Sequence, residues 1–387
     1  MGTDDVEGLT PADWKCSGTA GAYLQTRRSR KIGREWCPRN CPRNFLTEIR
    51  RVGRILVAGE ESNVVERIYA LQVLNNWRAI HGYPLNNFQN RLRWCAKLVD
   101  KDAVISQRIK RVPSIMAKLS STKLDRVKLD KIQDIAGCRA VVKTVKNVYT
   151  ILERFYDYNE TTGNGSYGTH KRIKVNDRIA EPKADGYRSL HLVYEYCVKG
   201  TSEHNELKIE IQLRTKLQHA WSTAVETVDA FTGSKLKAGE SNNEWGRFFK
   251  LASAAFAMIE GTRPVDLNIG YDTTYLRAAI KDSMEQLNVE DMLRSYNITM
   301  NFSDDRKANH KYYLLVNYGK GSGIVRAYKY SQFKFAMTDL VEEEKHKERN
   351  AVLVGVESFR ELKKAYPNYL ADTEKFIDTV KRFVSAK

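Results

Sequence analysis

A strictly alternating segment, LKIEIQLRT at residues 207–215, restricts the folds open to this 387-residue chain. Successive side chains of a β-strand point to opposite faces, so this segment would place its apolar residues on one face and its polar residues on the other. The polar face consists of Lys208, Glu210, Gln212 and Arg214. A helical pattern follows without a break, and its His219 and Glu226, seven residues apart, share one side of the helix. We therefore predict a strand that leads directly into a helix, and its polar face fits either a functional site or contact with water.

Strand and helix patterns alternate through the middle of the chain. CRAVVKT, SYGTHKRIKV and the stretch after residue 186 have strand character, whereas VYTILERFYDY and KLQHAWSTAVETVDAF have helical periodicity. Helical patterns also run through residues 45–57, 63–80 and about 87–104. This order predicts an α/β or α+β core with a mostly covered sheet.

A change of composition at residues 261–270, GTRPVDLNIG, indicates a boundary. Beyond it, strand patterns such as YYLLVNY, IVRAYKY and AVLVGV alternate with helical ones. We predict a basic, mostly helical N-terminal extension at residues 1–104, a central domain at 105–260 and a small α/β C-terminal domain at 271–387 that could be regulatory.

The net charge of +17 is concentrated towards the N-terminal end. Residues 1–130 hold 24 Lys and Arg against 13 Asp and Glu, and the interval from Arg27 to Arg54 holds ten basic residues against two acidic ones. Trp36 and Phe45 lie among them. A polyanion would meet such a basic, aromatic-bearing surface, but a solvated helix face has the same composition. Both interpretations stay open.

Composition also argues against several classes of protein. The N-terminal segment MGTDDVEGLT is acidic, and no stretch approaches the roughly 20 apolar residues that a membrane span requires. We therefore expect a soluble, cytoplasmic protein. The six cysteines follow no disulfide-framework spacing, so reduced thiols are expected, and Cys37 and Cys41 lack a second Cys/His pair for a zinc site.

The loop and strand at residues 181–196, EPKADGYRSLHLVYEY, carry a dense set of nucleotide-handling groups. Lys183, Arg188 and His191 can meet phosphate, and Tyr187 offers a ring on which a base can stack. Gly186 lets the backbone approach a ligand closely. The segment thus predicts a phosphate-and-base site.

Two carboxylates supplement this site. Asp134 lies just ahead of the apolar strand that contains Arg139, and Glu210 lies on the polar face of the alternating strand. Magnesium needs only one or two protein carboxylates when substrate phosphates and water complete its shell, and phosphoryl-type transfer depends on cations that neutralise developing charge. The P-loop pattern and kinase signatures are absent. These residues predict a Mg²⁺-nucleotide site of another type.

Three ordered segments resemble the synthetase domain of the RelA/SpoT family, the alarmone synthetases. They are DIAGCRAVV at 134–142, EPKADGYRSLH at 181–191 and EIQLRT at 210–215, and the similarity extends over roughly residues 105–230. The segment RIKRVPSIMAKL at 108–119 also looks like the family's ATP-binding region. The resemblance implies an α+β, nucleotidyltransferase-like core with a mixed sheet flanked by helices, and assigns it to residues 105–260.

The resemblance also implies a reaction, the transfer of the β,γ-pyrophosphoryl group of ATP to a ribose 3′-hydroxyl with Mg²⁺ as cofactor. Asp134 would hold the metal, and Glu210 would act as base or as a second metal ligand. The groups that would meet ATP are Arg108, Lys110, Ser114, Lys118 and Arg139. The acceptor would meet Lys183, Tyr187, Arg188 and His191, above a pocket floor of Gln212 and Arg214, with His219 and Glu226 in support. Two roles stay open, since Ser114 could cap a helix and Arg139 could pair with a carboxylate.

The sequence also departs from the family pattern. Asp177 is followed by Arg178, where the family often has an aromatic residue, which leaves the acceptor geometry open. No His-Asp dipeptide is present, so we expect a chain that synthesises and does not degrade.

The resemblance leaves the acceptor and the partners open. A small alarmone synthetase would use GDP or GTP, whereas the toxic branch of the group can use the 3′-CCA end of tRNA in toxin–antitoxin or anti-phage systems. In that case the basic N-terminal region would contact tRNA. The C-terminal domain could be a neutralising or sensing module, and an antitoxin or a phage protein could be its partner. A homo-oligomer is compatible with either. A third hypothesis is an inactive RNA-binding module, against which intact Asp134, Glu210 and Tyr187 argue.

Overall fold

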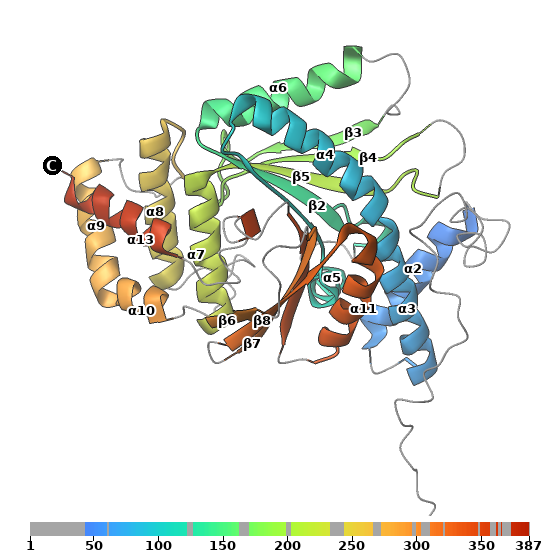
Figure 1. Cartoon of the computed structure of the whole chain (residues 1–387). Helices are drawn as coiled ribbons and strands as arrows, with labels where there is room; N and C mark the ends of the chain where they lie inside the picture. The colour runs from blue at the N-terminus through green and yellow to red at the C-terminus, as the bar shows by residue number, and fades with distance from the viewer. Residues whose placement is uncertain are drawn as a thin grey trace, which may run out of the picture.

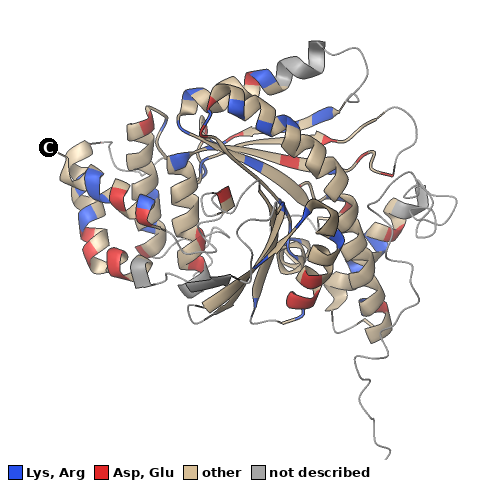
Figure 2. Cartoon of the chain, viewed as in Figure 1, with Lys and Arg blue, Asp and Glu red and all other residues tan. Residues whose placement is uncertain are grey.

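The computed structural model describes most of the chain. The described residues are 43–59, 62–121, 127–161, 170–198, 203–232, 244–265, 272–295, 299–302, 310–319, 322–346, 349–356, 361–362, 365 and 373–386. Cys16, Cys37, Cys41 and most of the basic segment with Trp36 lie outside these ranges. The Lys and Arg residues of the described elements are spread over several of them, among them α4 and β3, with acidic residues in between (Figure 2). The expected contact of the basic segment with a polyanion therefore stays a prediction.

Within the described residues, nine strands form one mixed sheet (Figure 1). Their order across the sheet is β3-β4-β5-β2-β1-β9-β7-β8-β6. The bounds are β1 (Val104–Ile109), β2 (Ala136–Val142), β3 (Lys171–Asp177), β4 (Leu190–Glu195), β5 (Lys208–Thr215), β6 (Thr299–Phe302), β7 (Tyr312–Gly319), β8 (Ser322–Tyr328) and β9 (Asn350–Gly355). The pairs β2–β5 and β6–β8 are parallel and the other neighbours are antiparallel. The predicted α+β class is confirmed.

One face of the sheet from β1 to β5 is buried under two helices. Helices α4 (Gly82–Val99) and α6 (Val145–Thr161) lie side by side on that face (Figure 1). The alternation in β5 is confirmed, because Ile209, Ile211 and Leu213 are at most 1% exposed and join the same apolar core as the two helices. The polar side chains of β5 consequently point to the opposite face.

Strand β1 was not predicted from the sequence. The helical pattern was expected to continue to about residue 104, but α4 ends at Val99 and Val104 begins the strand. Five of the six residues of β1 are buried, so the strand shows no alternation of apolar and polar residues. Its pairing with β2 places Arg108 opposite Gly137 and Ser106 opposite Arg139.

The C-terminal strands continue the same sheet. β9 pairs with β1 through Gln107–Gly355 and Arg108–Val354, and β7 and β8 extend the sheet beyond β9. Helix α11 (Phe333–Glu343) covers β7 and β9 on one face. The described strands on both sides of the predicted boundary at 261–270 therefore belong to one sheet, and the exact domain limits stay a prediction.

Two groups of helices complete the molecule. Helices α2 (Arg43–Ala58), α3 (Val64–Ile80) and α5 (Val112–Leu119) share an apolar cluster near the N-terminal end. Helices α7 (Lys216–Thr232), α8 (Glu244–Glu260), α9 (Thr273–Gln286), α10 (Val289–Ser295) and α13 (Glu374–Ser385) share another. Helix α8 was not predicted from the sequence. Ten of its residues are buried in the structure. No helix among the described residues is long and apolar enough to cross a membrane.

Candidate active site

The polar residues of β5 line up with residues of neighbouring strands on one face of the sheet. Glu210 lies beside Gly137 of β2, and Gly137 in turn lies beside Arg108 of β1. Gln212 lies between His191 of β4 and Arg139 of β2. Because paired residues of neighbouring strands project to the same face, four strands contribute side chains to one polar surface.

The Glu210 carboxylate is held from two sides. His191 Nδ1 lies 2.8 Å from Glu210 Oε1, and Gln212 Nε2 donates to Oε2 at 2.7 Å. Burial raises the pKa of Glu210, but the hydrogen bond and charge of His191 outweigh it, and the net shift is downward. Glu210 is therefore an oriented carboxylate at neutral pH.

His191 connects Glu210 to the loop that precedes β4. Its Nε2 lies 2.7 Å from the hydroxyl oxygen of Tyr187, so both ring nitrogens are engaged. Burial lowers the pKa of His191, but its interactions with Tyr187 and Glu210 outweigh that effect and raise it to about 9. This arrangement fits an imidazolium that donates to Glu210 and to Tyr187.

Tyr187 is surrounded by cations. The Lys183 ammonium lies 5.2 Å and the Arg214 guanidinium 5.1 Å from the centroid of its ring, and Arg214 also donates to its hydroxyl. Burial raises the pKa of Tyr187, but Arg214 and His191 outweigh that effect and lower it to about 8. Lys183 is exposed, whereas Arg214 is buried.

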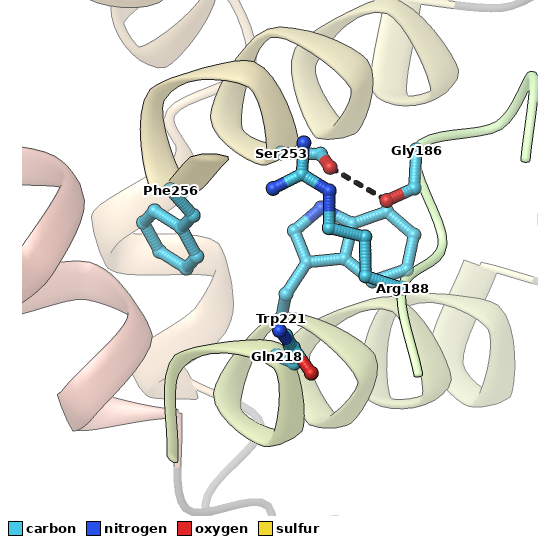
Figure 3. Close-up of a pocket in the computed structure, with 6 residues that line it drawn as sticks. All are labelled: Gly186, Arg188, Gln218, Trp221, Ser253 and Phe256. Atoms are coloured by element: carbon cyan, nitrogen blue, oxygen red, sulfur yellow. Dashed lines mark hydrogen bonds between the residues drawn. The ribbon is translucent and has the colours of Figure 1, made fainter. Parts of the chain in front are cut away.

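The Tyr187 loop is fixed to helix α8, as Figure 3 shows. Ser253 Oγ donates to the carbonyl oxygen of Gly186 at 2.6 Å. Gly186 has φ of +92°, and a Cβ at this position would lie 2.8 Å from the Cβ of Ser253. The turn therefore requires glycine for two reasons: the positive φ angle and the close contact with Ser253. Ser253 was missed because nothing distinguishes it in the sequence from other small residues of an apolar helix.

Arg188 points away from the acceptor residues. It lines a small pocket with Gln218, Trp221 and Phe256 (Figure 3). Its Nη2 donates to the carbonyl oxygen of Arg263 at 2.9 Å. Successive residues of an extended segment point to opposite sides, so Tyr187 and His191 face the polar surface while Arg188 faces the helices. The structure does not bring Arg188 together with the other predicted acceptor residues.

The junction between β3 and this loop is regular despite the departure at Arg178. Asp177 accepts hydrogen bonds from the backbone amides of Ile179 and Ala180 at 2.9 and 3.0 Å, and the amide of Arg178 pairs with the carbonyl of Ser189 at 3.0 Å. Backbone pairing beside the loop that contains Tyr187 thus does not depend on the side chain at position 178.

A second cluster surrounds Asp134 at the start of β2. Lys110 Nζ and Lys118 Nζ lie 2.7 and 2.9 Å from the two carboxylate oxygens of Asp134. Burial raises the pKa of Asp134, but the charges of Lys110 and Lys118 outweigh it and lower the pKa to about 2. The predicted ATP residues Lys110 and Lys118 thus meet the predicted metal carboxylate directly.

The remaining predicted ATP residues lie around this cluster. Arg108 belongs to β1, which ends one residue before Lys110, and its charge lowers the pKa of Lys110 after the larger effect of burial. Ser114 is the third residue of α5 and not its N-cap, which is Arg111. Arg139 donates to the carbonyl of Ala365 and so contacts the C-terminal segment.

The donor set fits a magnesium ion. Among the described residues no cluster of three or more His, Cys, Asp or Glu could hold a metal, but Asp134 and Glu210 are both ionised and interact electrostatically. Magnesium takes oxygen ligands and needs only one or two carboxylates when phosphates supply the rest.

The two predicted supporting residues, His219 and Glu226, lie on α7, which follows β5 directly.

The central part of the chain is similar to known proteins. A family model described as "Region found in RelA / SpoT proteins" matches residues 107–229. This part of the chain is a RelA/SpoT region. The matched region includes Asp134, Glu210 and the Tyr187 loop, whereas Ser253 and the strands β6 to β9 lie outside it.

Two curated proteins of Bacillus subtilis resemble the RelA/SpoT domain of this chain. The GTP pyrophosphokinase YjbM is 30% identical over 119 residues, which cover 31% of this chain and 52% of YjbM. The GTP pyrophosphokinase YwaC is 26% identical over 152 residues, which cover 39% of this chain and 61% of YwaC. The chain thus spans about half the length of the curated relatives that it matches.

A solved structure is also similar. The crystal structure of small alarmone synthetase 1 from Bacillus subtilis bound to its product pppGpp has a TM-score of 0.39 and 22% sequence identity, and the alignment covers 48% of this chain and 92% of that one.

Proposed function

We propose that the protein is an ATP-dependent pyrophosphokinase that transfers the β,γ-pyrophosphoryl group of ATP to the ribose 3′-hydroxyl of a guanine nucleotide. The observation that carries this proposal is the row formed by Glu210, Gly137 and Arg108 across three neighbouring strands. An acidic group and a basic group flank a position without a side chain, and a phosphate chain can approach the backbone there.

The donor side would be the Asp134 cluster. Lys110 and Lys118 pair with Asp134, and they would turn to the phosphates of ATP when it binds. Lys110 is only 17% exposed, so its ammonium acts in an environment where charge is weakly screened. Arg108 would add a third positive charge. Such cations stabilise the charge that develops on a transferring phosphoryl group.

The acceptor side would be the Glu210 network. Tyr187 would stack on the guanine, with Lys183 on the phosphates, and Glu210 would orient or deprotonate the 3′-hydroxyl. His191, whose two ring nitrogens are engaged by Glu210 and Tyr187, would position these two side chains and not the phosphates. Gln212 and His191 fix the Glu210 carboxylate at 2.7 and 2.8 Å, so the geometry at the reacting hydroxyl is set before the acceptor arrives. Arg214 would hold the Tyr187 hydroxyl and thereby the ring.

Magnesium, when bound, would supply charge neutralisation between the donor phosphates and the protein carboxylates. Asp134 would hold it, with Glu210 as the second carboxylate. Both groups have lowered pKa values and are therefore acceptor-only ligands at neutral pH.

The proposal is tested with ATP labelled in its γ-phosphate and, in separate reactions, GDP, GTP, ATP or deacylated tRNA as acceptor. Label should move to GDP or GTP, and Asp134→Asn should reduce the rate on the order of 100-fold or more. Asp102→Asn, a change of an exposed carboxylate next to β1, is the matched control and should leave the rate unchanged.

Each acceptor gives a distinct result. Label on tRNA without label on a guanine nucleotide would replace the proposed acceptor by an RNA 3′ end. Label on no acceptor, together with identical behaviour of the parent and Asp134→Asn, would rule out the enzyme in favour of a binding module.

A further inference from the structure

A buried ion pair joins the N-terminal helices to the end of α11. Arg78, in the last turn of α3, donates from Nη1 and Nη2 to the two carboxylate oxygens of Glu344 at 2.9 and 3.1 Å. The side chains are 0% and 6% exposed. The partners are 266 residues apart in sequence, so this bidentate pair is a long-range connection that no local pattern predicts.

Both partners also bind the backbone of the turn between β1 and α5. Arg78 Nε donates to the carbonyl oxygen of Lys110 at 2.9 Å, and Glu344 Oε1 accepts from the amide of Val112 at 3.1 Å. The amide of Lys110 pairs with the carbonyl of Ile135 at 2.8 Å. The turn that carries Lys110 is therefore fixed on three sides, and two of the three contacts come from the ion pair.

Glu344 serves α5 as a cap that the helix itself lacks. The N-cap residue of α5, Arg111, makes no side-chain capping hydrogen bond. Helix N-termini leave backbone amides without partners and favour negative charge, and the Glu344 carboxylate meets both needs. Because α5 has only eight residues, its N-terminal anchor also sets the position of Lys118 in its last turn.

Lys110 and Lys118 converge on Asp134 only if the turn and the helix hold this geometry. Their ammonium groups approach different oxygens of the same carboxylate, at 2.7 and 2.9 Å. A shift of about 1 Å in such a constellation can cost on the order of 100-fold in rate. The anchor of α5 therefore bears on the donor side of the site although Glu344 touches neither lysine side chain.

We infer that Glu344, together with Arg78, is a positioning residue for the donor-phosphate lysines. This inference rests on the proposed function for the identity of the donor, and it extends the site beyond residues 107–229 to a carboxylate supplied by the C-terminal part of the chain. The segment after α11 thus completes the donor side of the site.

The test compares Glu344→Gln with Glu342→Gln. Both changes remove one negative charge at the end of α11, but Glu342 is 63% exposed on its side chain and pairs only with Lys345 among its described contacts. Glu344→Gln should raise the KM for ATP or lower kcat/KM for ATP by about 10- to 100-fold and leave the KM for the guanine nucleotide unchanged. Glu342→Gln should behave like the parent. Equal losses of kcat/KM for ATP and for the guanine nucleotide would indicate general destabilisation and overturn the inference.

Two further measurements keep the test decisive if Glu344→Gln folds poorly or if no transfer is found. Glu344→Asp keeps the charge, should fold and should show an intermediate loss for ATP. Hydrogen exchange of the backbone amides at residues 112 and 114–119 needs no turnover. It should accelerate in both Glu344 variants, while the amides of α7 stay protected as in the parent. Unchanged exchange at 112–119 would contradict the positioning role even if the proposed reaction is absent.

Discussion

At the scale of single residues, a continuous set of hydrogen bonds joins Gln212, Glu210, His191, Tyr187 and Arg214. All five residues could be predicted from the sequence, because strand alternation and family resemblance place them on one face. The sequence does not show that the carboxylate at 210 and the ring at 187 are linked through His191. That link depends on the pairing of β4 with β5, which brings together residues 19 positions apart.

The pKa of His191 tests this link. We expect a value of about 9 in the parent and a fall towards 6.5 in Glu210→Gln, because the variant lacks the carboxylate that favours the imidazolium. Nuclear magnetic resonance of the ring nitrogens during a pH titration measures both values. Since the folded pKa exceeds the unfolded value of 6.5, the stabilisation from this pair is fully present below pH 6.5 and is lost as the pH rises through about 9. A parent midpoint at or below 6.5 would contradict the ion pair.

Gly186→Ala should impair both stability and acceptor binding. The left-handed conformation costs a residue with a Cβ roughly 1–2 kcal/mol, and the new Cβ would also meet Ser253. Gly261→Ala is the matched control, since Gly261 has φ of +63° and a Cβ added there would meet nothing within 4 Å. Thermal unfolding should show a larger loss for Gly186→Ala, and only this variant should raise the KM for the guanine nucleotide. Equal effects of the two variants would mean that the contact with α8 is unimportant.

At the scale of elements, helix α8 supports the Tyr187 loop, the proposed acceptor loop, from outside the matched region. Ser253 of α8 packs against Gly186 and donates to its carbonyl oxygen. Trp221 of α7, inside the matched region, lies on the same side of the loop, with its ring centroid 6.4 Å from that of Tyr187. The strands and helices with clear periodicity, among them β5 and α7, were predicted correctly. β1 and the limits of α4 were not predicted correctly. A strand that is buried on both faces shows no alternation of apolar and polar residues, so the sequence gives no sign of where the helix ends and the strand begins.

Ser253→Ala should weaken acceptor binding selectively. Loss of one hydrogen bond of about 1 kcal/mol corresponds to about a fivefold rise in the dissociation constant if the loop loses its bound conformation. Ser283→Ala removes a comparable buried serine, whose hydroxyl donates to the carbonyl of Ala279 at 2.9 Å, and should leave binding unchanged. Calorimetry with GDP compares the two variants. The idea fails if both bind GDP like the parent.

At the scale of the whole molecule, the C-terminal strands complete the sheet and do not form a separate one. Val104 and Val141 pack with Val352, Val354 and Leu315 in one apolar cluster, so the centre of the sheet is built from both ends of the chain. The sequence could not show this, since pairing of β1 with β9 joins residues about 250 positions apart and leaves no local signal. The predicted boundary at 261–270 lies between helices α8 and α9, which pack in one apolar cluster, and the domain limits stay a prediction.

Truncation after Pro264 should therefore abolish cooperative folding. It would remove β9 from the side of β1 and expose the apolar residues of the shared cluster, which favours aggregation through the open strand edge. Circular dichroism during heating, with sedimentation of the same samples, tests this. A soluble, monomeric fragment that melts cooperatively at the temperature of the full chain would show that the C-terminal strands are dispensable.

The central claim is that Asp134 and Glu210 mark the donor and acceptor sides of one pyrophosphoryl-transfer site. The most direct measurement is the stoichiometry of products from ATP and a guanine nucleotide, with chromatography and mass spectrometry of every nucleotide formed. We predict one AMP for each acceptor that gains two phosphates, with both products lost together in Asp134→Asn and in Glu210→Gln. Formation of ADP with a singly phosphorylated acceptor, or release of AMP without any modified acceptor, would contradict the claim.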